Sequence, residues 1–189
     1  MQLKNKIALI DFDKTLIEVD SLGLIFLKEK LYLNTKLFFY GFILFLCKCF
    51  PKNKQLYIRS LFKKNLLKLI KLLPENKLDE YISDFKEKLN KDLVRDIKSE
   101  NYDLIFVVSA SEESIIEKVL DGELEVNAII SNKITHLSKN FITCWGVEKL
   151  HRLKELIEIE QFKEIHVYTD SYDDKPLLDI ATKEIILKN

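Results

Sequence analysis

A short apolar segment near the start of the chain ends abruptly in two carboxylates. Residues 7–16 read Ile-Ala-Leu-Ile-Asp-Phe-Asp-Lys-Thr-Leu. The apolar run predicts a buried strand, and open α/β sheets bind their ligands at the edge where such strands end. Asp11 and Asp13 repel each other at that edge unless a cation lies between them or one carboxyl keeps its proton. The segment therefore predicts a cation-assisted phosphoryl-transfer site, with an Asp-containing surface turn as the alternative.

Two later apolar runs, residues 104–108 and 165–169, also end in polar side chains. The first leads into Ser109 and the second into Asp170. A hydroxyl at a strand end can hold a phosphate oxygen together with nearby backbone N–H groups, and an acid there can hold a cation. The residues after the first run predict a helix that is capped by Ser111.

A lysine and two further acids complete the groups that phosphoryl transfer requires. Gly146 opens a segment that we expect to be helical to about Glu160, which places Lys149 near the start of a helix. Asp173 and Asp174 follow the third apolar run, although Asp173 is also typical of a solvated loop. A nucleophile, a proton shuttle, a cation for the phosphate and ligands for a metal thus occur in one chain.

With these motifs, the sequence resembles the haloacid dehalogenase superfamily in its phosphoserine-phosphatase-like branch. The resemblance covers most of the chain and includes residues 170–178, Asp-Ser-Tyr-Asp-Asp-Lys-Pro-Leu-Leu. It implies a magnesium-dependent phosphomonoesterase in which Asp11 is the nucleophile and Asp13 the general acid/base. It further implies that phosphate is bound by Thr15, Ser109 and Lys149, and that Mg²⁺ is held by Asp11, Asp13, Asp170 and Asp174.

The same residues disfavour three other functional classes. A receiver domain also combines acids, a hydroxyl and a lysine, but its phosphorylated Asp lies on a middle strand, whereas Asp11 follows the first. A protein that keeps the fold and only binds partners is disfavoured, because Asp11 and Asp13 are both present. We expect no binding of nucleic acid, since the lysines lack the arginine-rich pattern with interleaved aromatic residues of a base-reading surface.

The segment between the first two motifs predicts a helical insertion. Apolar residues recur there at spacings of three and four, and Pro51 and Pro74 divide the segment into about four helices. Elsewhere apolar runs alternate with helical segments, which predicts a Rossmann-like α/β core with a parallel sheet. We therefore expect a catalytic core of residues 1–19 and 91–189 and a helical cap of residues 20–90.

Two segments of the predicted core have less distinct patterns. Residues 125–130 predict a further strand. Residues 132–143 are polar without a clear period and predict a short hairpin or an irregular segment.

The predicted cap combines a long apolar run with an unusual balance of charge. Residues 37–47 carry no charge, but this run is well short of the roughly 20 residues that a membrane-spanning helix needs. Eleven Lys or Arg residues stand against one acid, Glu29, in residues 21–73, although the whole chain has 30 residues of each sign. The run predicts either a helix packed in the cap's own core or a helix lying in a membrane interface.

We expect residues 36–71 to dock on an anionic membrane, with the aromatic residues from Phe38 to Phe45 in the interface and the lysines at the headgroups. In this respect the sequence resembles C-type phosphatidylglycerophosphatases and related polyprenyl-lipid phosphatases. That resemblance implies a lipid-linked phosphate as substrate and a cytoplasmic protein at the inner face of the membrane. The alternative is a soluble phosphatase for phosphoserine or a sugar phosphate. Asp20 either meets the ammonium group of such a substrate or caps the first cap helix.

The remaining chemically active side chains show no ligand spacing. The cysteines form no CxxC or Cys/His pattern, which is typical of reduced thiols in the cytoplasm. We expect Trp145 and the histidines to be structural or exposed, and no signal peptide before the first strand. The residues concerned are Cys47, Cys49, Cys144, His136, His151 and His166.

Overall fold

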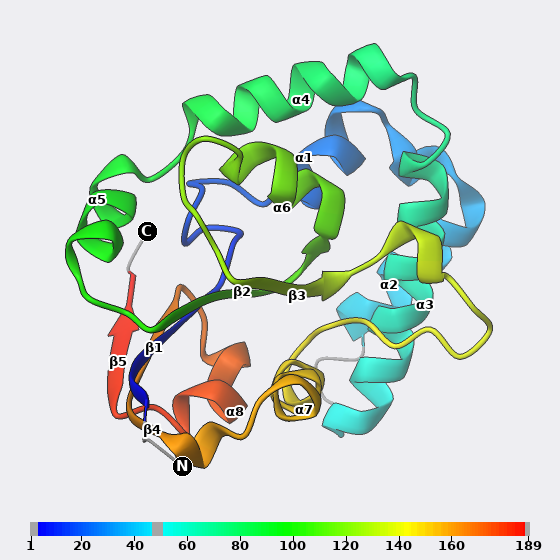
Figure 1. The fold of residues 1–189 in the computed structure, drawn as a ribbon. Helices are drawn as coiled ribbons and strands as arrows, with labels where there is room; N and C mark the ends of the chain where they lie inside the picture. Colours follow the sequence, from blue (N-terminus) through cyan, green and yellow to red (C-terminus); the bar gives the residue numbers. More distant parts are fainter. Residues whose placement is uncertain (1–3, 47–50, 188–189) are drawn as a thin grey trace.

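The computed structural model of the chain describes residues 4–46 and 51–187. Its centre is a sheet of five strands in the order β3-β2-β1-β4-β5 (Figure 1), and the sheet is parallel, as the sequence predicted. The strands are β1 (Lys4–Ile10), β2 (Leu104–Glu112), β3 (Ala128–Asn132), β4 (Phe162–Thr169) and β5 (Lys183–Ile186).

The direction of chain progression reverses beside β1. Ile10 pairs with Val107 of β2 on one side and with Tyr168 of β4 on the other. The chain moves outward from β1 through β2 to β3, and then returns to place β4 on the opposite side of β1. Ligands of open α/β sheets bind beyond the strand ends at such a reversal. The residues that follow β1 and β4 therefore occupy the expected binding position.

Both faces of the sheet are covered by helices because β1 is apolar on both sides. Ile7 and Leu9 belong to a hydrophobic cluster with residues of α7 (Val147–Leu156) and α8 (Lys175–Leu178). Ala8 and Ile10 belong to a second cluster on the other face, which includes residues of α5 (Lys91–Ser99) and α6 (Glu113–Leu120). Successive strand residues point to opposite faces, so this alternation fixes the register of β1 between two helical layers.

Among the described residues, the predicted cap of residues 20–90 holds four α-helices, as expected from its apolar spacing. They are α1 (Ser21–Lys28), α2 (Thr35–Leu46), α3 (Lys52–Ile70) and α4 (Glu75–Glu87), and a short 3₁₀ turn, Leu31–Leu33, precedes α2. We call this segment, residues 21–87, the insertion. Pro51 and Pro74 stand directly before α3 and α4, where a missing N–H costs nothing.

The insertion has two parts that lie differently against the sheet. The helices α2 and α3 pack on each other and lie beyond the C-terminal end of β3, whereas α4 lies over α6 (Figure 1). An ion pair of 2.9 Å between Lys118 and Asp79 joins α6 to α4. No helix of the described residues has the length and apolar character needed to cross a bilayer.

Several predicted boundaries were wrong. The helix after β2 is capped by Glu112, whose carboxylate accepts from the N–H of Ile115 at 3.2 Å, because Ser111 is engaged elsewhere. The helix after Gly146 ends at Leu156, and Ile159–Gln161 form a separate 3₁₀ turn. The helical spacing of the sequence did not reveal this interruption.

The edge strands were also predicted incompletely. β3 begins at Ala128 rather than at residue 125, since its pairing with β2 starts where Ala128 meets Phe106. Of the two expectations for residues 132–143, the structure shows the irregular segment, with the 3₁₀ turn Ile134–His136, and no hairpin. The short strand β5 has two exposed charged residues and two half-buried apolar ones, which is too weak a pattern to predict a strand.

Candidate active site

Asp11 and Asp13 follow β1 and face a cavity of about 230 Å³ at the carboxyl edge of the sheet. Phe12, between them, is completely buried in the core. The N–H of Asp11 donates to the carbonyl of Tyr168 at 2.9 Å, which fixes the end of β1 against β4. Lys14 then adopts a φ of 56°, and its N–H donates to Val19 at 3.1 Å. Both carboxylates, which precede this turn, line the same cavity.

The structure brings almost all of the predicted site residues to this one cavity. Its lining includes Asp11, Asp13, Ser109, Lys149, Asp170 and Asp174. Thr15 is the exception, because it is buried and does not line the cavity. Its hydroxyl has no hydrogen-bond partner among the described residues. A role for Thr15 in phosphate binding therefore stays a prediction.

Lys149 connects two of the acids. Its Nζ lies 2.8 Å from Oδ1 of Asp11 and 2.7 Å from Oδ1 of Asp174. The hydroxyl of Thr169 also donates to Asp174, at 2.8 Å. Burial alone lowers the pKa of Lys149, but the charges of Asp11 and Asp174 outweigh burial and raise that pKa above its ordinary value. Lys149 is therefore a permanent cation beside the candidate nucleophile.

Burial dominates the electrostatics of Asp11. It raises the pKa of Asp11 to about 7, against the opposing effect of Lys149, and the charge of Asp174 adds to the rise. A nucleophilic carboxylate has to be ionised, so this environment favours additional positive charge close to Asp11.

Asp13 is held in place by two serines. The N–H of Ser21 donates to its Oδ1 at 2.8 Å, and the hydroxyl of Ser111 donates to its Oδ2. The two serine hydroxyls lie 2.9 Å apart. Burial and the charge of Asp20 raise the pKa of Asp13, which suits a group that has to carry a proton. Sequence reasoning had assigned Ser111 only to helix capping.

The side of the cavity formed by the insertion carries two bases that sequence reasoning had assigned to a membrane surface. Arg59 and Lys63 are four residues apart on α3, so they share one helical face, and both line the cavity. Burial lowers the pKa of both side chains. The Nε of Arg59 is buried and has no hydrogen-bond partner among the described residues. The spacing of four was the available signal, but it did not reveal which face of α3 is turned inward.

Trp145 forms part of the cavity wall instead of packing in the core. The guanidinium of Arg59 stacks on its indole ring, with 4.1 Å between Cζ and the ring centroid. The indole N–H donates to Oδ2 of Asp173 at 3.2 Å. A nearby bond from the N–H of Thr143 to the hydroxyl of Ser60, at 3.0 Å, fastens α3 to the same loop of the core.

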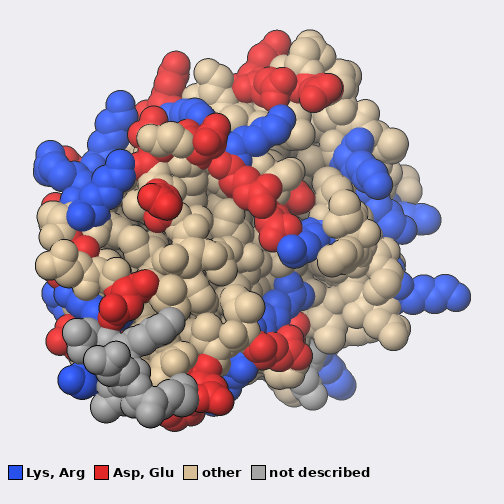
Figure 2. Space-filling model, viewed as in Figure 1, with Lys and Arg blue, Asp and Glu red and all other residues tan. Residues whose placement is uncertain are grey.

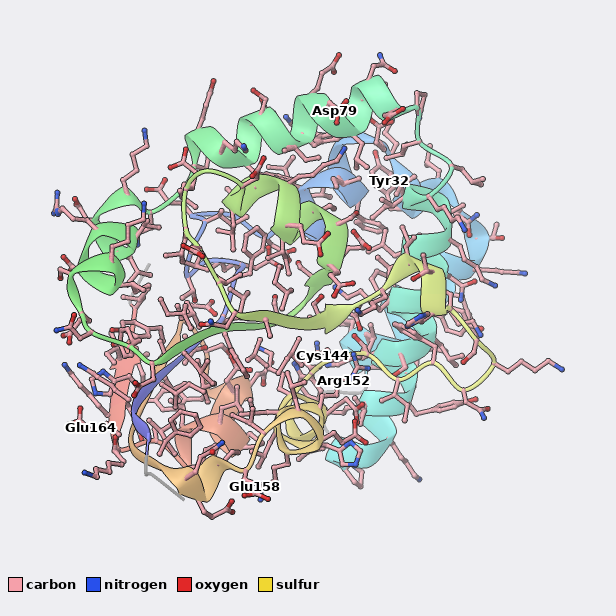
Figure 3. All side chains as sticks on the ribbon, viewed as in Figure 1. Tyr32, Asp79, Cys144, Arg152, Glu158 and Glu164 are labelled. Carbon is pink, nitrogen blue, oxygen red and sulfur yellow. The ribbon has the colours of Figure 1, made fainter. Side chains whose placement is uncertain are left out.

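Buried polar contacts hold the loop that leads to Lys149. The side chain of Asn132 accepts from the N–H of Cys144 at 2.9 Å and donates to Ala110 at 2.6 Å. Arg152 donates to the carbonyls of Ser131 and Ile142 and lies beside Cys144 in Figure 3. The Cys144 thiol is free and buried, and burial raises its pKa to about 12, so it is a structural thiol as expected. Cys47 and Cys49 lie outside the described residues.

Asp20 performs the capping role that was one of its two expected roles. Its Oδ1 accepts from the N–H of Gly23 at 2.8 Å at the start of α1. A Cβ at position 23 would come within 2.7 Å of this carboxylate, so the cap requires glycine there. Asp20 also lines the cavity, which leaves its second expected role open.

The residues of the cavity fit a magnesium ion. Six Asp and four Lys or Arg side chains line the cavity, which gives a formal charge of −2 that a divalent cation balances. Among the described residues, no three His, Cys, Asp or Glu side chains converge as a closed metal site. Asp174, an expected ligand, has both oxygens directed at Lys149. Magnesium commonly takes only one or two carboxylates and keeps several waters, so Asp11, Asp170 and a backbone carbonyl suffice.

The comparisons with known proteins agree with this geometry. The chain resembles a protein of unknown function from Bordetella pertussis, with 18% identity and a TM-score of 0.63, over 97% of this chain and 90% of that one. It resembles a phosphoserine phosphohydrolase-like protein from Francisella tularensis, with 23% identity and a TM-score of 0.58, over 97% and 86%. It also resembles a phosphoserine phosphatase in its apo form, with 16% identity and a TM-score of 0.59, over 97% and 86%.

At these identities the structural likeness establishes the fold, and it gives no support to the lipid-phosphatase branch that we expected. A comparison with curated proteins gave no match. The family model of haloacid dehalogenase-like hydrolases, however, matches residues 8–179, which include every motif that lines the cavity. The chain therefore belongs to the family of haloacid dehalogenase-like hydrolases.

Proposed function

We propose that the protein is a magnesium-dependent phosphomonoesterase that acts through an aspartyl-phosphate on Asp11. The observation that carries this proposal is the meeting of Asp11, Asp13, Ser109 and Lys149 in one cavity at the carboxyl edge of the sheet. These groups supply a nucleophile, a proton shuttle and charge for the phosphate, which are the requirements of phosphoryl transfer.

The first half of the reaction transfers the phosphoryl group to the protein. A carboxylate oxygen of Asp11 attacks phosphorus in line with the ester oxygen, so that a new P–O bond forms as the ester P–O bond breaks. Asp13 gives its proton to the leaving alcohol, for which its raised pKa is suited. Lys149 and Ser109 neutralise and orient the phosphate oxygens.

The second half returns the enzyme to its starting state. Asp13, now a carboxylate, removes a proton from water, and the water oxygen attacks the phosphorus of the aspartyl-phosphate. The bond between Asp11 and phosphorus breaks and inorganic phosphate leaves. Mg²⁺, held by Asp11, the backbone carbonyl of Asp13 and Asp170, would supply positive charge to the phosphate oxygens during both halves. Asp174 orients Lys149 through the ion pair between the two side chains.

The chemistry of the cavity favours a small, polar phosphate ester. The cavity is about 230 Å³ in volume, and Ala110 and Trp145 are the only apolar side chains that line it among the described residues. Arg59 and Lys63 add positive charge from the insertion, beyond what Lys149 provides for the phosphate. These features support a leaving alcohol that carries an anionic group, such as the carboxylate of phosphoserine. A sugar phosphate is the related possibility, and the fold likeness to phosphoserine phosphatases is consistent with either.

A lipid-linked phosphate is the second candidate substrate. One observation favours it: α2 exposes several aromatic side chains. An enzyme that acts on a substrate embedded in a membrane needs an apolar surface of this kind to reach it. The polar lining of the cavity disfavours it.

A panel of phosphate esters tests the proposal. We expect phosphoserine or a sugar phosphate to give a higher kcat/KM than phosphatidylglycerophosphate dispersed in detergent, with magnesium present. The change Lys63→Met should raise KM by about tenfold for esters with an anionic alcohol, because a hydrogen bond to a charged group is lost. Lys68→Met, at an exposed position of the same helix, is the matched control. Hydrolysis of the lipid ester alone would support the second candidate, and no hydrolysis of any ester would contradict both.

A further inference from the structure

The outer face of α2 carries five large apolar side chains. Phe38, Phe39, Phe42, Phe45 and Leu46 are 66%, 57%, 55%, 70% and 54% exposed, and we call these five residues the aromatic face. Their spacing along the helix places them on one side of it. The opposite side of α2 is turned inward: Leu37 is completely buried, and a Cβ at Gly41 would lie 3.7 Å from Phe62 of α3.

Packing within the insertion accounts for only one side of the apolar run. A run that packed the core of the insertion would have its aromatic side chains buried, and here they are more than half exposed. Contiguous exposed apolar patches mark sites that bind another surface. The aromatic face lies outside the cavity lining, so catalysis does not account for it.

The charges around the aromatic face indicate which surface it binds. Residues 30–74 contain ten Lys or Arg and no acid. Among the bases of this range that the structure describes, only Arg59 and Lys63 line the cavity. Lys36, Lys64 and Lys68 form no ion pair with any described residue. In Figure 2, basic side chains project from the outer edge of the α2–α3 side, and the acids visible in this view lie elsewhere.

We propose that the aromatic face and the bases around it dock the protein on an anionic membrane surface. An interface of this kind offers apolar acyl chains to the phenylalanines and anionic headgroups to the lysines at the same time. A second copy of the chain is a poorer partner, because a symmetric contact brings the same bases of both copies together. This inference does not depend on the substrate of the active site.

The test is sedimentation with vesicles of phosphatidylcholine and phosphatidylglycerol, compared with vesicles of phosphatidylcholine alone, at low salt. We expect the protein to pellet with the mixed vesicles and to remain in the supernatant with the neutral ones. Raised salt should release it, because salt screens exposed charges. Lys36→Gln should weaken partitioning about fivefold. Lys163→Gln, which changes an exposed lysine of β4, should leave partitioning unchanged.

The triple change Phe38→Ser, Phe42→Ser and Phe45→Ser should weaken partitioning by about tenfold or more. Leu156→Ser is the matched control, since Leu156 is 55% exposed on α7 and does not belong to the aromatic face. Unchanged hydrolysis of a soluble phosphate ester shows that the triple variant is folded.

Two results would overturn the proposal. One is a wild-type protein that stays in the supernatant with the mixed vesicles at low salt. The other is a concentration-dependent dimer in sedimentation equilibrium that the triple variant abolishes, which assigns the aromatic face to contact between copies of the chain.

Discussion

The hydroxyl of Ser111, in β2, donates a hydrogen bond to the carboxylate of Asp13, which follows the neighbouring strand β1. The two residues are 98 positions apart in the chain, and Ser21 supplies a second donor to the same carboxylate. Asp13 thus has a fixed orientation at the cavity before substrate arrives. Preorganised groups of this kind contribute to catalysis through geometry as well as through charge.

Removal of the Ser111 hydroxyl should therefore affect turnover more than binding. We expect Ser111→Ala to lower kcat by about tenfold with little change in KM, the effect of losing one hydrogen bond to a charged group. Ser111→Thr, which keeps a hydroxyl, should restore most of the activity. Ser99→Ala removes an exposed hydroxyl far from the site and serves as the control. A rise in KM with unchanged kcat would show that Ser111 binds substrate instead of orienting Asp13.

The buried ion pair of Asp174 with Lys149 should contribute to stability as well as to activity. Asp174→Asn leaves the buried Lys149 with Asp11 as its one remaining carboxylate partner among its described contacts. We expect the free energy of unfolding to fall by about 3 kcal/mol, as for other buried pairs that lose one partner. The exposed pair of Lys175 with Asp179 is the matched control, and Asp179→Asn should change stability by less than about 1 kcal/mol. Urea denaturation measures the loss of unfolding free energy in each variant. Equal losses would contradict a stabilising role for the pair of Asp174 with Lys149.

Magnesium should be required for activity and should stabilise the fold. A chelator should abolish turnover, and added Mg²⁺ should restore it, because Asp11 and Asp170 face one cavity whose formal charge is −2. Saturating Mg²⁺ should also raise the melting temperature, since it binds the folded chain alone. Asp170→Asn should remove this rise, whereas Asp173→Asn should keep it. A rise that survives Asp170→Asn would place the ion elsewhere.

Stability should fall as the pH falls through about 6.5 because of His166. This side chain is buried, and its Nδ1 lies 2.9 Å from the hydroxyl of Tyr102. Burial lowers its pKa below the ordinary 6.5. The unfolded chain therefore binds a proton at a higher pH than the folded chain does, and the fold loses stability as the pH falls below 6.5. His166→Gln should reduce this loss in urea denaturation above and below pH 6.5, and an unchanged loss would assign it to other groups.

The sequence predicted the catalytic edge of the sheet because the signals there are local. Asp11 and Asp170 directly follow the apolar strands β1 and β4, and Ser109 follows the apolar run of β2 although that strand continues to Glu112. Parallel strands bring these positions to the same edge of the sheet. The residues that orient these side chains were not predictable in the same way. Ser111 reaches Asp13 through strand pairing, and a pattern confined to one segment carries no information about such a contact.

The insertion shows the limit of charge counting. The excess of bases over acids was visible in the sequence, but not the direction in which each base points. Arg59 and Lys63 face the cavity, and Lys36 and Lys68 are exposed. The helical periodicity of α3 is weak because apolar and basic residues occur on most of its sides. Only the packing of α3 against α2 and the core separates the two groups of bases.

Trapping of the intermediate tests the central proposal most directly. The enzyme should be mixed with its best ester and magnesium, quenched in acid during turnover and digested for mass spectrometry. We expect one phosphoryl group on the peptide that contains Asp11, and we expect it to be absent from Asp11→Asn, which should also lose turnover because an amide is not nucleophilic. Turnover of Asp11→Asn within about tenfold of the wild-type rate, or a phosphoryl group on another residue, would contradict the proposal.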